Sequence, residues 1–327
     1  MKTLVTGGAG FIGSHLCEEL LRRGRSVTVI DDCSTGREDN LREIRKDPHF
    51  RFVQGTIMDR DLMARLIRYH DIVYHLAAAV GVKYVLHDPI SAMTTNTHGT
   101  EILLELASRF KKSVLLASTS EIYGKHSSDK IKEDDGSVFG PTHVLRWNYA
   151  VSKALDEIMA AAYAQRKHLK VITIRFFNVV GPRQSSHYGM VIPRLVEKAL
   201  NGMPLTVFGD GKQIRTFLHV QDAVRAVADL SEKPSLYGQV FNIGGDEPVT
   251  INQLAHRIRE LSPSKPRIQH LGYGKFYGDH FEDIPCRIPD VSRLQKAIGF
   301  KPEYDLDQIL RSVIASFEPS FAEEALA

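Results

Sequence analysis

A tyrosine and a lysine at positions i and i+4, Tyr149 and Lys153, could carry acid–base chemistry in this chain. If the segment is helical, both side chains lie on one face of the helix. An ammonium beside a phenol favours the phenolate and lowers its pKa, so Tyr149 is a candidate proton acceptor near neutral pH. The same spacing also occurs in ordinary amphipathic helices, in which the tyrosine packs and the lysine is solvated. The assignment therefore depends on the rest of the chain.

A second polar cluster, Thr119, Ser120 and Glu121, follows the apolar run 114–117. This run is typical of a short buried strand, so hydroxyl and carboxyl groups stand where the strand ends. Ligands bind at the carboxyl ends of the strands in parallel α/β sheets. These three residues are therefore candidate catalytic residues, together with the tyrosine and the lysine.

A glycine-rich segment, Gly7-Gly8-Ala9-Gly10-Phe11-Ile12-Gly13, lies between a predicted strand at 2–6 and a predicted helix that starts near Ser14. Glycines in such a turn let the backbone approach a pyrophosphate, and the helix N-terminus offers unpaired N–H groups. A strand at 27–30 ends at Asp31, about 20 residues beyond the last glycine. An acid at this place accepts from the adenosine ribose 2′-hydroxyl and repels a 2′-phosphate, which favours NAD over NADP.

The elements that position these groups are predicted as alternating strands and helices. After the first two strands we expect strands at 52–59, 71–78, 114–117 and 171–178, and long helices at 91–110 and 148–166. This alternation predicts an α/β fold with a Rossmann-type doubly wound parallel sheet. Asp59 ends the third predicted strand, and the fourth passes into small residues against which a cofactor could lie.

The pattern changes after residue 178, where proline and glycine turns become frequent. We expect a NAD-binding Rossmann domain over 1–178 and a smaller α/β substrate domain over 179–327, with a strand near 238–245 returning to the first domain. Arg183, Arg215 and Arg287 lie in this second half. Guanidinium groups suit diphosphate oxygens, although a single arginine is more often part of a surface ion pair.

The bulk composition is that of an ordinary globular chain. The 327 residues are 43% hydrophobic and 25% charged, and the net charge of +3 gives no strong basic field for nucleic acid or an anionic membrane. The three cysteines lack CxxC spacing and the histidines lack ligand spacing, so we expect no disulfide framework and no metal site. No apolar run suggests a membrane span or a signal peptide, and we expect a cytoplasmic protein with no membrane partner.

Several motifs carry a family resemblance: T-G-G-A-G-F-I-G-S-H-L, H-L-A-A, N-T-H-G-T, S-T-S-E-I-Y-G and Y-A-V-S-K, in this order. In these motifs the chain resembles the extended short-chain dehydrogenases, and within them the NAD-dependent epimerase/dehydratase group that acts on nucleotide sugars. The resemblance runs from residue 3 to about residue 305. It implies NAD as cofactor, a UDP-sugar substrate, and a homodimer formed by a four-helix bundle of the helices near 91–110 and 148–166.

The resemblance also implies roles for individual residues. Thr119 would be the active-site hydroxyl, Tyr149 the base that deprotonates a sugar hydroxyl, and Lys153 the residue that binds the nicotinamide ribose and tunes the tyrosine. Cofactor contacts are expected, besides Tyr149 and Lys153, from Gly7, Gly10, Phe11, Ile12, Gly13, Asp31, Asp59, Leu76, Ala77, Ala78 and Asn96. Substrate contacts are expected from Tyr84, Asn178, Phe208, Arg215 and Arg287.

The reaction is predicted from Ser120 and Glu121, which would position the sugar and assist proton steps. Members of this group oxidise carbon 4 of the sugar, and the dehydratases carry an aspartate where this chain has Ser120, so dehydration is disfavoured. Thr-Ser-Glu and the R-W-N-Y-A-V-S-K of 146–153 resemble UDP-glucuronate decarboxylases, which give UDP-xylose. Arg146 would either pair with the substrate carboxylate or be solvated on the helix surface.

Two alternatives stay open beside decarboxylation. A 4-epimerase acting on a UDP-hexose or UDP-hexuronate would share the same oxidation at carbon 4. A non-catalytic NAD-binding protein of this fold is disfavoured, because it would be expected to lose the threonine, the tyrosine or the lysine, and all three are present.

Overall fold

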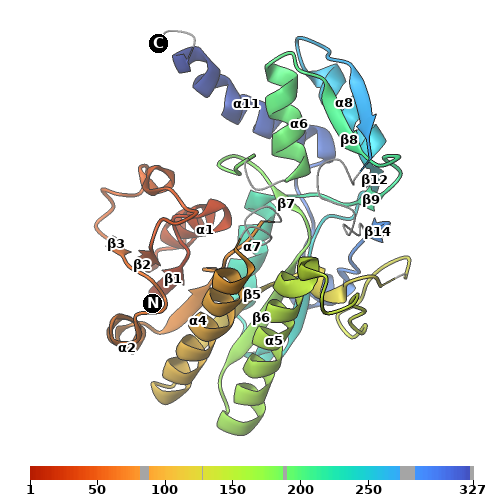
Figure 1. Cartoon of the computed structure of the whole chain (residues 1–327). Helices are drawn as coiled ribbons and strands as arrows, with labels where there is room; N and C mark the ends of the chain where they lie inside the picture. Colours follow the sequence, from red (N-terminus) through yellow and green to blue (C-terminus); the bar gives the residue numbers. More distant parts are fainter. Residues whose placement is uncertain (82–87, 127, 187–189, 273–283, 325–327) are drawn as a thin grey trace.

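The computed structural model describes residues 1–81, 88–126, 128–186, 190–272 and 284–324, with side chains described to residue 317 (Figure 1). The helices are α1 (Phe11–Arg22), α2 (Arg60–Tyr69), α4 (Pro89–Arg109), α5 (Asn148–Lys167), α6 (Val191–Leu200), α7 (Val220–Ser231), α8 (Ile251–Leu261), α10 (Ser292–Ile298) and α11 (Leu306–Glu324). Short 3-10 turns are η1 (Glu38–Leu41), η2 (Ser120–Tyr123), η3 (Leu145–Trp147) and η4 (Pro234–Leu236).

The main sheet has seven parallel strands in the order β11-β6-β5-β4-β1-β2-β3. These strands are β1 (Lys2–Thr6), β2 (Ser26–Asp31), β3 (Phe50–Gln54), β4 (Ile72–His75), β5 (Ser113–Thr119), β6 (Val171–Phe176) and β11 (Val240–Ile243). The chain moves outward from β1 in one direction to β3 and then crosses back to β4, so the strand order reverses between β1 and β4. This order confirms the predicted doubly wound parallel sheet.

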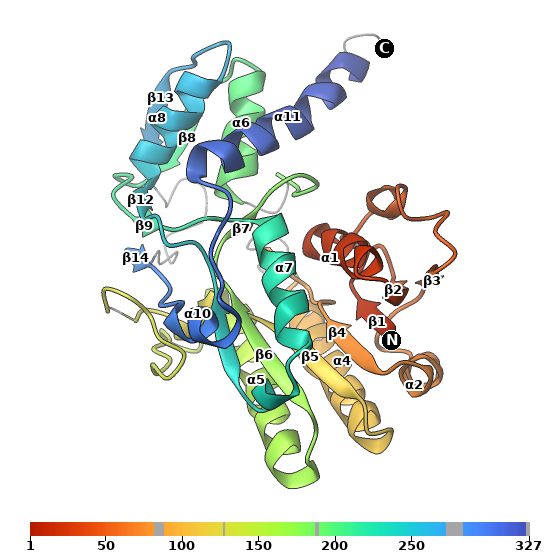
Figure 2. The same ribbon diagram turned by 180° about the vertical axis from the view of Figure 1, so that it is seen from behind.

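Helices cover both faces of the sheet, which explains the nearly continuous apolar sequence of its strands. Helices α4 and α5 lie side by side on one face (Figure 1), and α1 and α7 pack together on the other (Figure 2). Side chains alternate between two cores because successive residues of a strand point to opposite faces. Leu4 and Leu116 pack with α2, α4 and α5, whereas Val5 and Leu115 pack with α1 and α7.

Several predicted strands are shorter than the sequence pattern suggested. The strand expected at 52–59 ends at Gln54, the strand expected at 71–78 ends at His75, and the strand expected at 171–178 ends at Phe176. Asp59 therefore does not end a strand. It is the N-cap of α2, and its carboxylate accepts a hydrogen bond from the backbone N–H of Leu62 at 2.9 Å. An aspartate at this place satisfies one of the unpaired N–H groups of a helix start, and this competing role was not evident from the strand pattern.

The second half of the chain contributes to both parts of the molecule. A separate core forms where α6, α8 and α11 pack around the parallel pair β8 (Leu205–Phe208) and β13 (Ile268–Leu271). A small sheet joins β12 (Val249–Thr250), β9 (Ile214–Arg215) and β14 (Cys286–Arg287), and β7 (Val179–Val180) pairs with β10 (Leu218–His219). Helix α7 and strand β11, in contrast, complete the first core, with β11 beside β6 at the edge of the main sheet.

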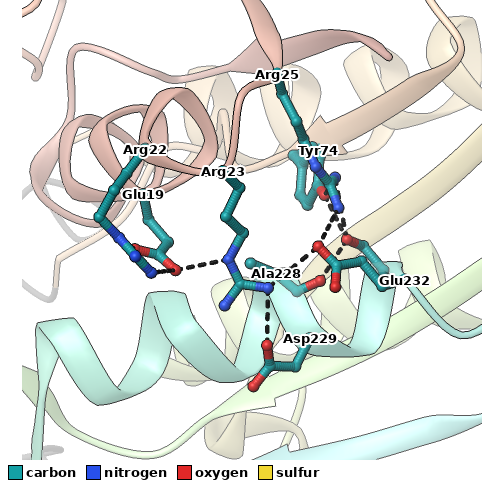
Figure 3. A network of polar contacts seen from close by, with 9 residues as sticks. Glu19, Arg22, Arg23, Arg25, Tyr74, Ala228, Asp229 and Glu232 are labelled. Atoms are coloured by element: carbon teal, nitrogen blue, oxygen red, sulfur yellow. Dashed lines mark hydrogen bonds and ion pairs between the residues drawn. The ribbon is translucent and has the colours of Figure 1, made fainter.

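A polar network joins α1 to α7 at the end of the sheet where the strands begin (Figure 3). The guanidinium of Arg25, 6% exposed, donates to the hydroxyl of Tyr74 at 2.6 Å and to Glu232 at 2.8 Å. Arg23 donates to Glu19 at 2.6 Å and pairs with Asp229 at 2.8 Å. The network therefore ties the first helix of the chain to a helix from its second half.

Among the described residues, none of the helices combines the length and the apolar character that crossing a lipid bilayer requires.

Candidate active site

The candidate site residues meet at the carboxyl ends of β1, β2, β4 and β5. The glycine turn follows β1, Asp31 ends β2, residues 76–78 follow β4, and Thr119 ends β5. These strands are neighbours in the sheet, and the order reverses between β1 and β4. A reversal of this kind opens a crevice at the carboxyl edge, where ligands of doubly wound sheets bind.

The glycine turn packs too closely against neighbouring backbone to accept side chains. Gly7 has φ +71°, and a Cβ there would lie 2.7 Å from the backbone nitrogen of Ala77. A Cβ on Gly13 would collide with the carbonyl oxygen of Gly7. Helix α1 begins at Phe11 without any side chain capping its first N–H groups. Phe11 and Ile12 lie in this first turn, and the uncapped helix start fits the pyrophosphate of NAD.

Asp31 is held by the loops that surround it. It is 9% exposed, and its two carboxylate oxygens accept from the backbone N–H groups of Ala9 at 2.9 Å and Cys33 at 2.8 Å. Burial raises the pKa of this carboxyl, while the two backbone donors oppose the shift. A carboxylate has further acceptor capacity beyond two such bonds, so the residue can still accept from a ribose hydroxyl.

The segment after β4 lies against the glycine turn. Leu76 and Ala77 donate their backbone N–H groups to the carbonyl and the side-chain oxygen of Thr6, at 3.1 and 3.2 Å. Beyond Ala78, the buried amide of Asn96 accepts from the N–H of residue 79 at 2.7 Å and donates to its carbonyl at 3.3 Å. Asn96 therefore fixes the path of this segment. Tyr84, an expected substrate contact, lies outside the described residues.

Thr119 and Tyr149 are brought together across the site. Thr119 caps η2, and its hydroxyl oxygen accepts from the N–H of Glu121 at 3.2 Å. It also forms a hydrogen bond with the phenol of Tyr149, which reaches it from the first turn of α5. The hydroxyl predicted from the end of β5 and the phenol predicted on the helix therefore share one site.

The predicted effect of Lys153 on Tyr149 is not found in this arrangement. Burial raises the pKa of the phenol above its usual value, the nearby carboxylate of Glu121 raises it further, and the Thr119 hydrogen bond opposes both. The ammonium of Lys153, 2% exposed, instead donates to Asp156 at 2.7 Å. The positive charge that was expected to favour a phenolate is largely neutralised by this carboxylate.

Glu121 lies between two arginines. Its Oε1 accepts from Arg287 at 2.6 Å and its Oε2 accepts from Arg146 at 3.0 Å. Burial alone would raise the pKa of this carboxyl, but the two guanidiniums outweigh it and hold the pKa at about 2. Glu121 is therefore ionised at neutral pH, where it can accept hydrogen bonds but has no proton to donate.

Arg146 is not solvated on a helix surface, which was one of its two predicted environments. Its side chain is 10% exposed, and its guanidinium lies over the ring of Trp147 at 4.8 Å from the ring centre. The other arginine of the pair, Arg287, is also close to Ser120, whose hydroxyl lies 3.5 Å from its Nη1. Ser120, 3% exposed, therefore belongs to the same buried cluster.

The expected substrate contacts come from several elements of the second half. Arg215 in β9 and Arg287 in β14 are direct partners in the parallel register of these two strands. Asn178, at φ +37°, donates its side-chain amide to the carbonyl of Thr216 at 2.9 Å, one residue beyond β9. Two arginines that are distant in sequence thus become neighbours, close to the loop that follows β6.

Phe208 and Arg183 have other partners in the structure. Phe208 ends β8, is 8% exposed, and has the guanidinium of Arg194 over its ring at 4.6 Å from the centre. Arg183 reaches back to α1, where it donates to Glu18 at 2.6 Å and to Ser14 at 3.2 Å. This ion pair is the role that a single arginine most often has.

Sequence reasoning missed two residues of the site region. Asp156 follows Lys153 at i+3 on the same helix, a spacing that could have suggested an ion pair. Arg194 gave no signal, because its contact with Phe208 links a helix to a strand. In the part of the chain that the structure describes, no group of three or more His, Cys, Asp or Glu residues is arranged to hold a metal ion.

The chain is similar in sequence to known proteins over most of its length. The model of the NAD dependent epimerase/dehydratase family matches residues 3–244. The chain is 41% identical over 318 residues, 97% of either chain, to the UDP-N-acetyl-alpha-D-glucosaminuronate decarboxylase of Bacillus cytotoxicus. It is 33% identical to UDP-glucuronic acid decarboxylase 1 of Danio rerio, covering 99% of this chain and 74% of the relative.

A solved structure with the same architecture is the UDP-glucuronic acid 4-epimerase from Bacillus cereus in complex with UDP-glucuronic acid and NAD. It superposes with a TM-score of 0.88 at 29% identity, covering 98% of this chain and 100% of that chain. The similarity extends over both halves of the molecule.

Proposed function

The chain belongs to the NAD dependent epimerase/dehydratase family, and we propose that it decarboxylates a UDP-hexuronate after oxidising carbon 4 of the sugar. The observation that carries this proposal is the partly buried cluster of Glu121, Arg146 and Arg287 beside Tyr149. Its two guanidiniums and one carboxylate leave an excess of one positive charge. Such an excess favours a sugar that carries a carboxylate over a neutral sugar.

The first step needs a base on the hydroxyl at carbon 4. Bound NAD supplies the hydride acceptor, and its positively charged nicotinamide ring favours the phenolate of Tyr149. The glycine turn at Gly7, Gly10 and Gly13 and the carboxylate of Asp31 would hold this cofactor. Tyr149 takes the hydroxyl proton while the hydride leaves carbon 4, which becomes a ketone, and Thr119 orients the phenol through its hydrogen bond.

The ketone makes the uronate a β-keto acid. The bond from carbon 5 to the carboxylate breaks, CO₂ leaves, and the electron pair moves to the carbon 4 oxygen as an enolate. Hydroxyl donors near this oxygen, Tyr149 and Thr119, stabilise the negative charge. Carbon 5 then takes a proton from solvent water, the hydride returns to carbon 4, and Tyr149 returns its proton to the carbon 4 oxygen.

Glu121 contributes to these steps as an anion. With a pKa of about 2 it holds its negative charge throughout the neutral range, so it cannot be the acid that protonates carbon 5. We assign it the task of positioning Arg146 and Arg287 and of accepting a hydrogen bond from the sugar or from a water. Ser120 supports Arg287 from the same turn.

Two relatives support decarboxylation and leave the sugar to be identified. The relative from Bacillus cytotoxicus is named for a UDP-N-acetyl-glucosaminuronate and the one from Danio rerio for a UDP-glucuronic acid. The two sugars differ at carbon 2, where one carries an acetamido group and the other a hydroxyl. We propose that this chain acts on one of these two, with a UDP-pentose as product, UDP-xylose in the case of UDP-glucuronate.

A 4-epimerase remains a second candidate because of the solved structure named as a UDP-glucuronic acid 4-epimerase. That reaction shares the oxidation at carbon 4 and returns the hydride to the other face of the ketone. It requires the carboxylate to stay on the sugar. The two functions therefore differ in the mass of the product.

The discriminating experiment is incubation with NAD and, in separate reactions, UDP-glucuronate and its 2-acetamido analogue, followed by mass analysis. Loss of the mass of CO₂ from either substrate supports decarboxylation. An unchanged mass with altered chromatographic behaviour means epimerisation. If neither substrate nor any other UDP-sugar is converted, both proposals are wrong.

We also propose a homodimer formed through α4 and α5. On α5 the apolar side chains of Val151, Leu155 and Ile158 are 47%, 44% and 65% exposed, and Ile90 of α4 is 74% exposed. The three on α5 share one face at i, i+4 and i+7, and α4 lies beside α5 (Figure 1). Light scattering should give twice the chain mass for the native protein and a smaller mass for Leu155→Lys; a native monomer would contradict the proposal.

We further propose that the chain divides into two domains near residue 178 and that the protein is cytoplasmic. Separate cores on either side support the division, although α7 and β11 return to the first core. Three free cysteines suit a reducing compartment. Calorimetry with a UDP-sugar should resolve two unfolding steps if the second part melts separately, and cell fractionation tests the location.

A further inference from the structure

The ion pair of Lys153 and Asp156 is buried more completely than most charged groups in proteins. Lys153 is 2% exposed and Asp156 is 0% exposed, and their Nζ and Oδ2 atoms lie 2.7 Å apart. Both residues are on α5, Lys153 about one turn and Asp156 about two turns beyond Tyr149. A buried ion pair is weak support for stability, because apolar residues of similar volume often replace one at no loss. Its position next to the candidate base suggests a different role.

Asp156 is held from two further elements. The hydroxyl of Thr100 on α4 forms a hydrogen bond with the Asp156 carboxylate and lies 3.2 Å from Nε2 of His75. The other ring nitrogen of His75, on β4, lies 2.8 Å from the hydroxyl of Thr6. Thr6 in turn accepts from the N–H of Ala77 at 3.2 Å. A continuous buried chain of hydrogen bonds therefore runs from the segment after β4 to Asp156.

The charged and titratable groups around Lys153 come from three elements. Asp156 and Tyr149 lie on its own helix, with Glu157 acting on Asp156 from the same helix. His75 faces it from β4, and burial together with Lys153 lowers the pKa of this imidazole to about 3, so the ring is neutral. Glu121 acts on Tyr149 from η2 but is already paired with two arginines. Asp156 is the partner in direct contact with the ammonium.

We propose that Asp156 is a positioning residue for the reaction, because its carboxylate neutralises the Lys153 ammonium and thereby keeps the proton on the Tyr149 phenol. This inference rests on the proposed function, in which Tyr149 takes a proton and later returns it. Asp156 thereby raises the pH at which Tyr149 becomes the phenolate that can take the proton of the carbon 4 hydroxyl.

The consequence of removing the carboxylate has a definite sign. In Asp156→Asn the amide keeps the size of the side chain but leaves the ammonium without its counter-charge. The phenol then loses its proton more readily, because a nearby positive charge favours the phenolate and a nearby negative charge has been removed. We expect the apparent pKa of Tyr149 to fall by about one pH unit.

The test is a pH titration of Tyr149 by NMR in protein labelled at the tyrosine ring carbon that bears the hydroxyl, with saturating NAD and no sugar nucleotide. The Tyr149 signal is assigned by its loss in Tyr149→Phe. In Asp156→Asn it should move toward the phenolate position at lower pH than in the native protein, and Asp156→Glu should restore the native curve. Titration curves that coincide for the native protein and Asp156→Asn overturn the proposal.

A matched control is Glu157→Gln, the next residue on the helix, whose carboxylate is paired with Arg175 at 2.7 Å. Glu157→Gln should lower stability, but it should shift the titration curve of Tyr149 much less than Asp156→Asn does. If Asp156→Asn does not fold, Thr100→Val provides the second variant. It removes one hydrogen bond to the carboxylate and should move the Tyr149 curve in the same direction by less, whereas an unmoved curve counts against the proposal.

A turnover measurement separates this inference from the proposed function. With a substrate that the native enzyme converts, the acid limb of the pH–rate profile should lie about one pH unit lower for Asp156→Asn than for the native enzyme, because Tyr149 loses its proton more readily. If the native protein converts no UDP-sugar, the proposed function fails while the NMR titration still decides the effect of Asp156 on Tyr149. If turnover occurs and the titration curves coincide, only the role of Asp156 is wrong.

Discussion

Glu121 illustrates how a residue's environment decides which chemistry it can perform. Its type and position suggested help with proton steps. Between Arg146 and Arg287 it has a pKa of about 2, and a group that stays ionised at neutral pH accepts protons poorly and donates none. The same pairing concentrates positive charge where an anionic sugar would bind. The side chain is thus better suited to organising the arginines than to acid catalysis.

Replacing Tyr149 with phenylalanine removes the base and leaves the ring. We expect the rate of conversion of the UDP-uronate to fall by about 10²–10⁴-fold, the usual contribution of a positioned acid–base group. Affinity for UDP should be unchanged, since the phenol is not among the expected diphosphate contacts. Steady-state kinetics with UDP binding by calorimetry checks both.

Tyr163→Phe is the matched control, because Tyr163 lies on the same helix and packs into the core between the sheet and the helices. It should keep nearly native activity. Native activity in Tyr149→Phe would exclude that residue as the base.

Replacing Glu121 with glutamine should impair decarboxylation more than oxidation at carbon 4. The amide preserves the shape but leaves Arg146 and Arg287 without their shared carboxylate. With this negative charge removed, the two guanidiniums would bind the substrate carboxylate more tightly, and a carboxylate stabilised in this way loses CO₂ more slowly. NADH absorbance reports the oxidation, and product mass reports the decarboxylation. Equal loss of both steps would contradict this role.

Among the helices, strands and turns, the sequence predicted those features that depend on short stretches of the chain. The glycine turn, the long helices and the parallel sheet follow from local periodicity and from one strand–turn–helix unit, and the fold prediction is confirmed by the strand order. Asp59 could not be placed in this way. An aspartate can cap a helix or follow the end of a strand, and only the path of the chain after Gln54 shows that Asp59 caps α2.

The contacts within the site could not be predicted, because they join distant segments. Arg215 and Arg287 become neighbours only because β9 and β14 pair, and Arg287 meets Glu121 only across the two halves of the molecule. Lys153 was expected to act on Tyr149, but it pairs with the carboxylate of Asp156, which lies at i+3 on the same helix. The spacing indicates which residues could pair, and the three-dimensional surroundings determine which pair forms.

The network between α1 and α7 gives a prediction about elements. Arg25 is buried and donates to Tyr74 and Glu232, so Arg25→Met removes charge-assisted hydrogen bonds that join the two halves of the chain (Figure 3). We expect a loss of about 2–3 kcal/mol in the free energy of unfolding, measured by urea denaturation. Activity should be retained at temperatures where the variant is folded, because the network lies at the opposite edge of the sheet from the site.

Arg22→Met is the control for this loss. Arg22 belongs to the same figure and pairs with Glu19 at 2.8 Å, but its side chain is 70% exposed. An exposed ion pair contributes little to stability, so this variant should unfold at nearly the native urea concentration. Equal destabilisation of the two variants would mean that burial is not what gives Arg25 its effect.

For the whole molecule, four buried histidines among the described residues connect stability to pH. His15 and His219 have their pKa values lowered to about 4 and His75 to about 3, and the pKa of His70 is lowered as well, in each case mainly by burial. The unfolded chain has ordinary histidines that take up protons below about pH 6.5. Between that pH and about 4 the unfolded state therefore binds more protons than the folded state. Stability should fall as the pH is lowered through this window.

His219 allows this dependence to be tested at one position. It is the N-cap of α7, its ring accepts from the N–H of Gln221 at 3.3 Å, and it stacks on Tyr304. Asparagine also caps helices well but does not titrate, so His219→Asn should keep the cap and remove the proton uptake. The lost stacking should lower the stability of this variant at pH 8. Between pH 8 and pH 5, however, its free energy of unfolding should fall by about 2 kcal/mol less than that of the native protein.

Urea denaturation at each pH measures the difference. His256→Gln, at an exposed histidine, is the control, and its free energy of unfolding should depend on pH as in the native protein. Parallel pH profiles for His219→Asn and the native protein would show that the buried imidazole does not drive the acid sensitivity.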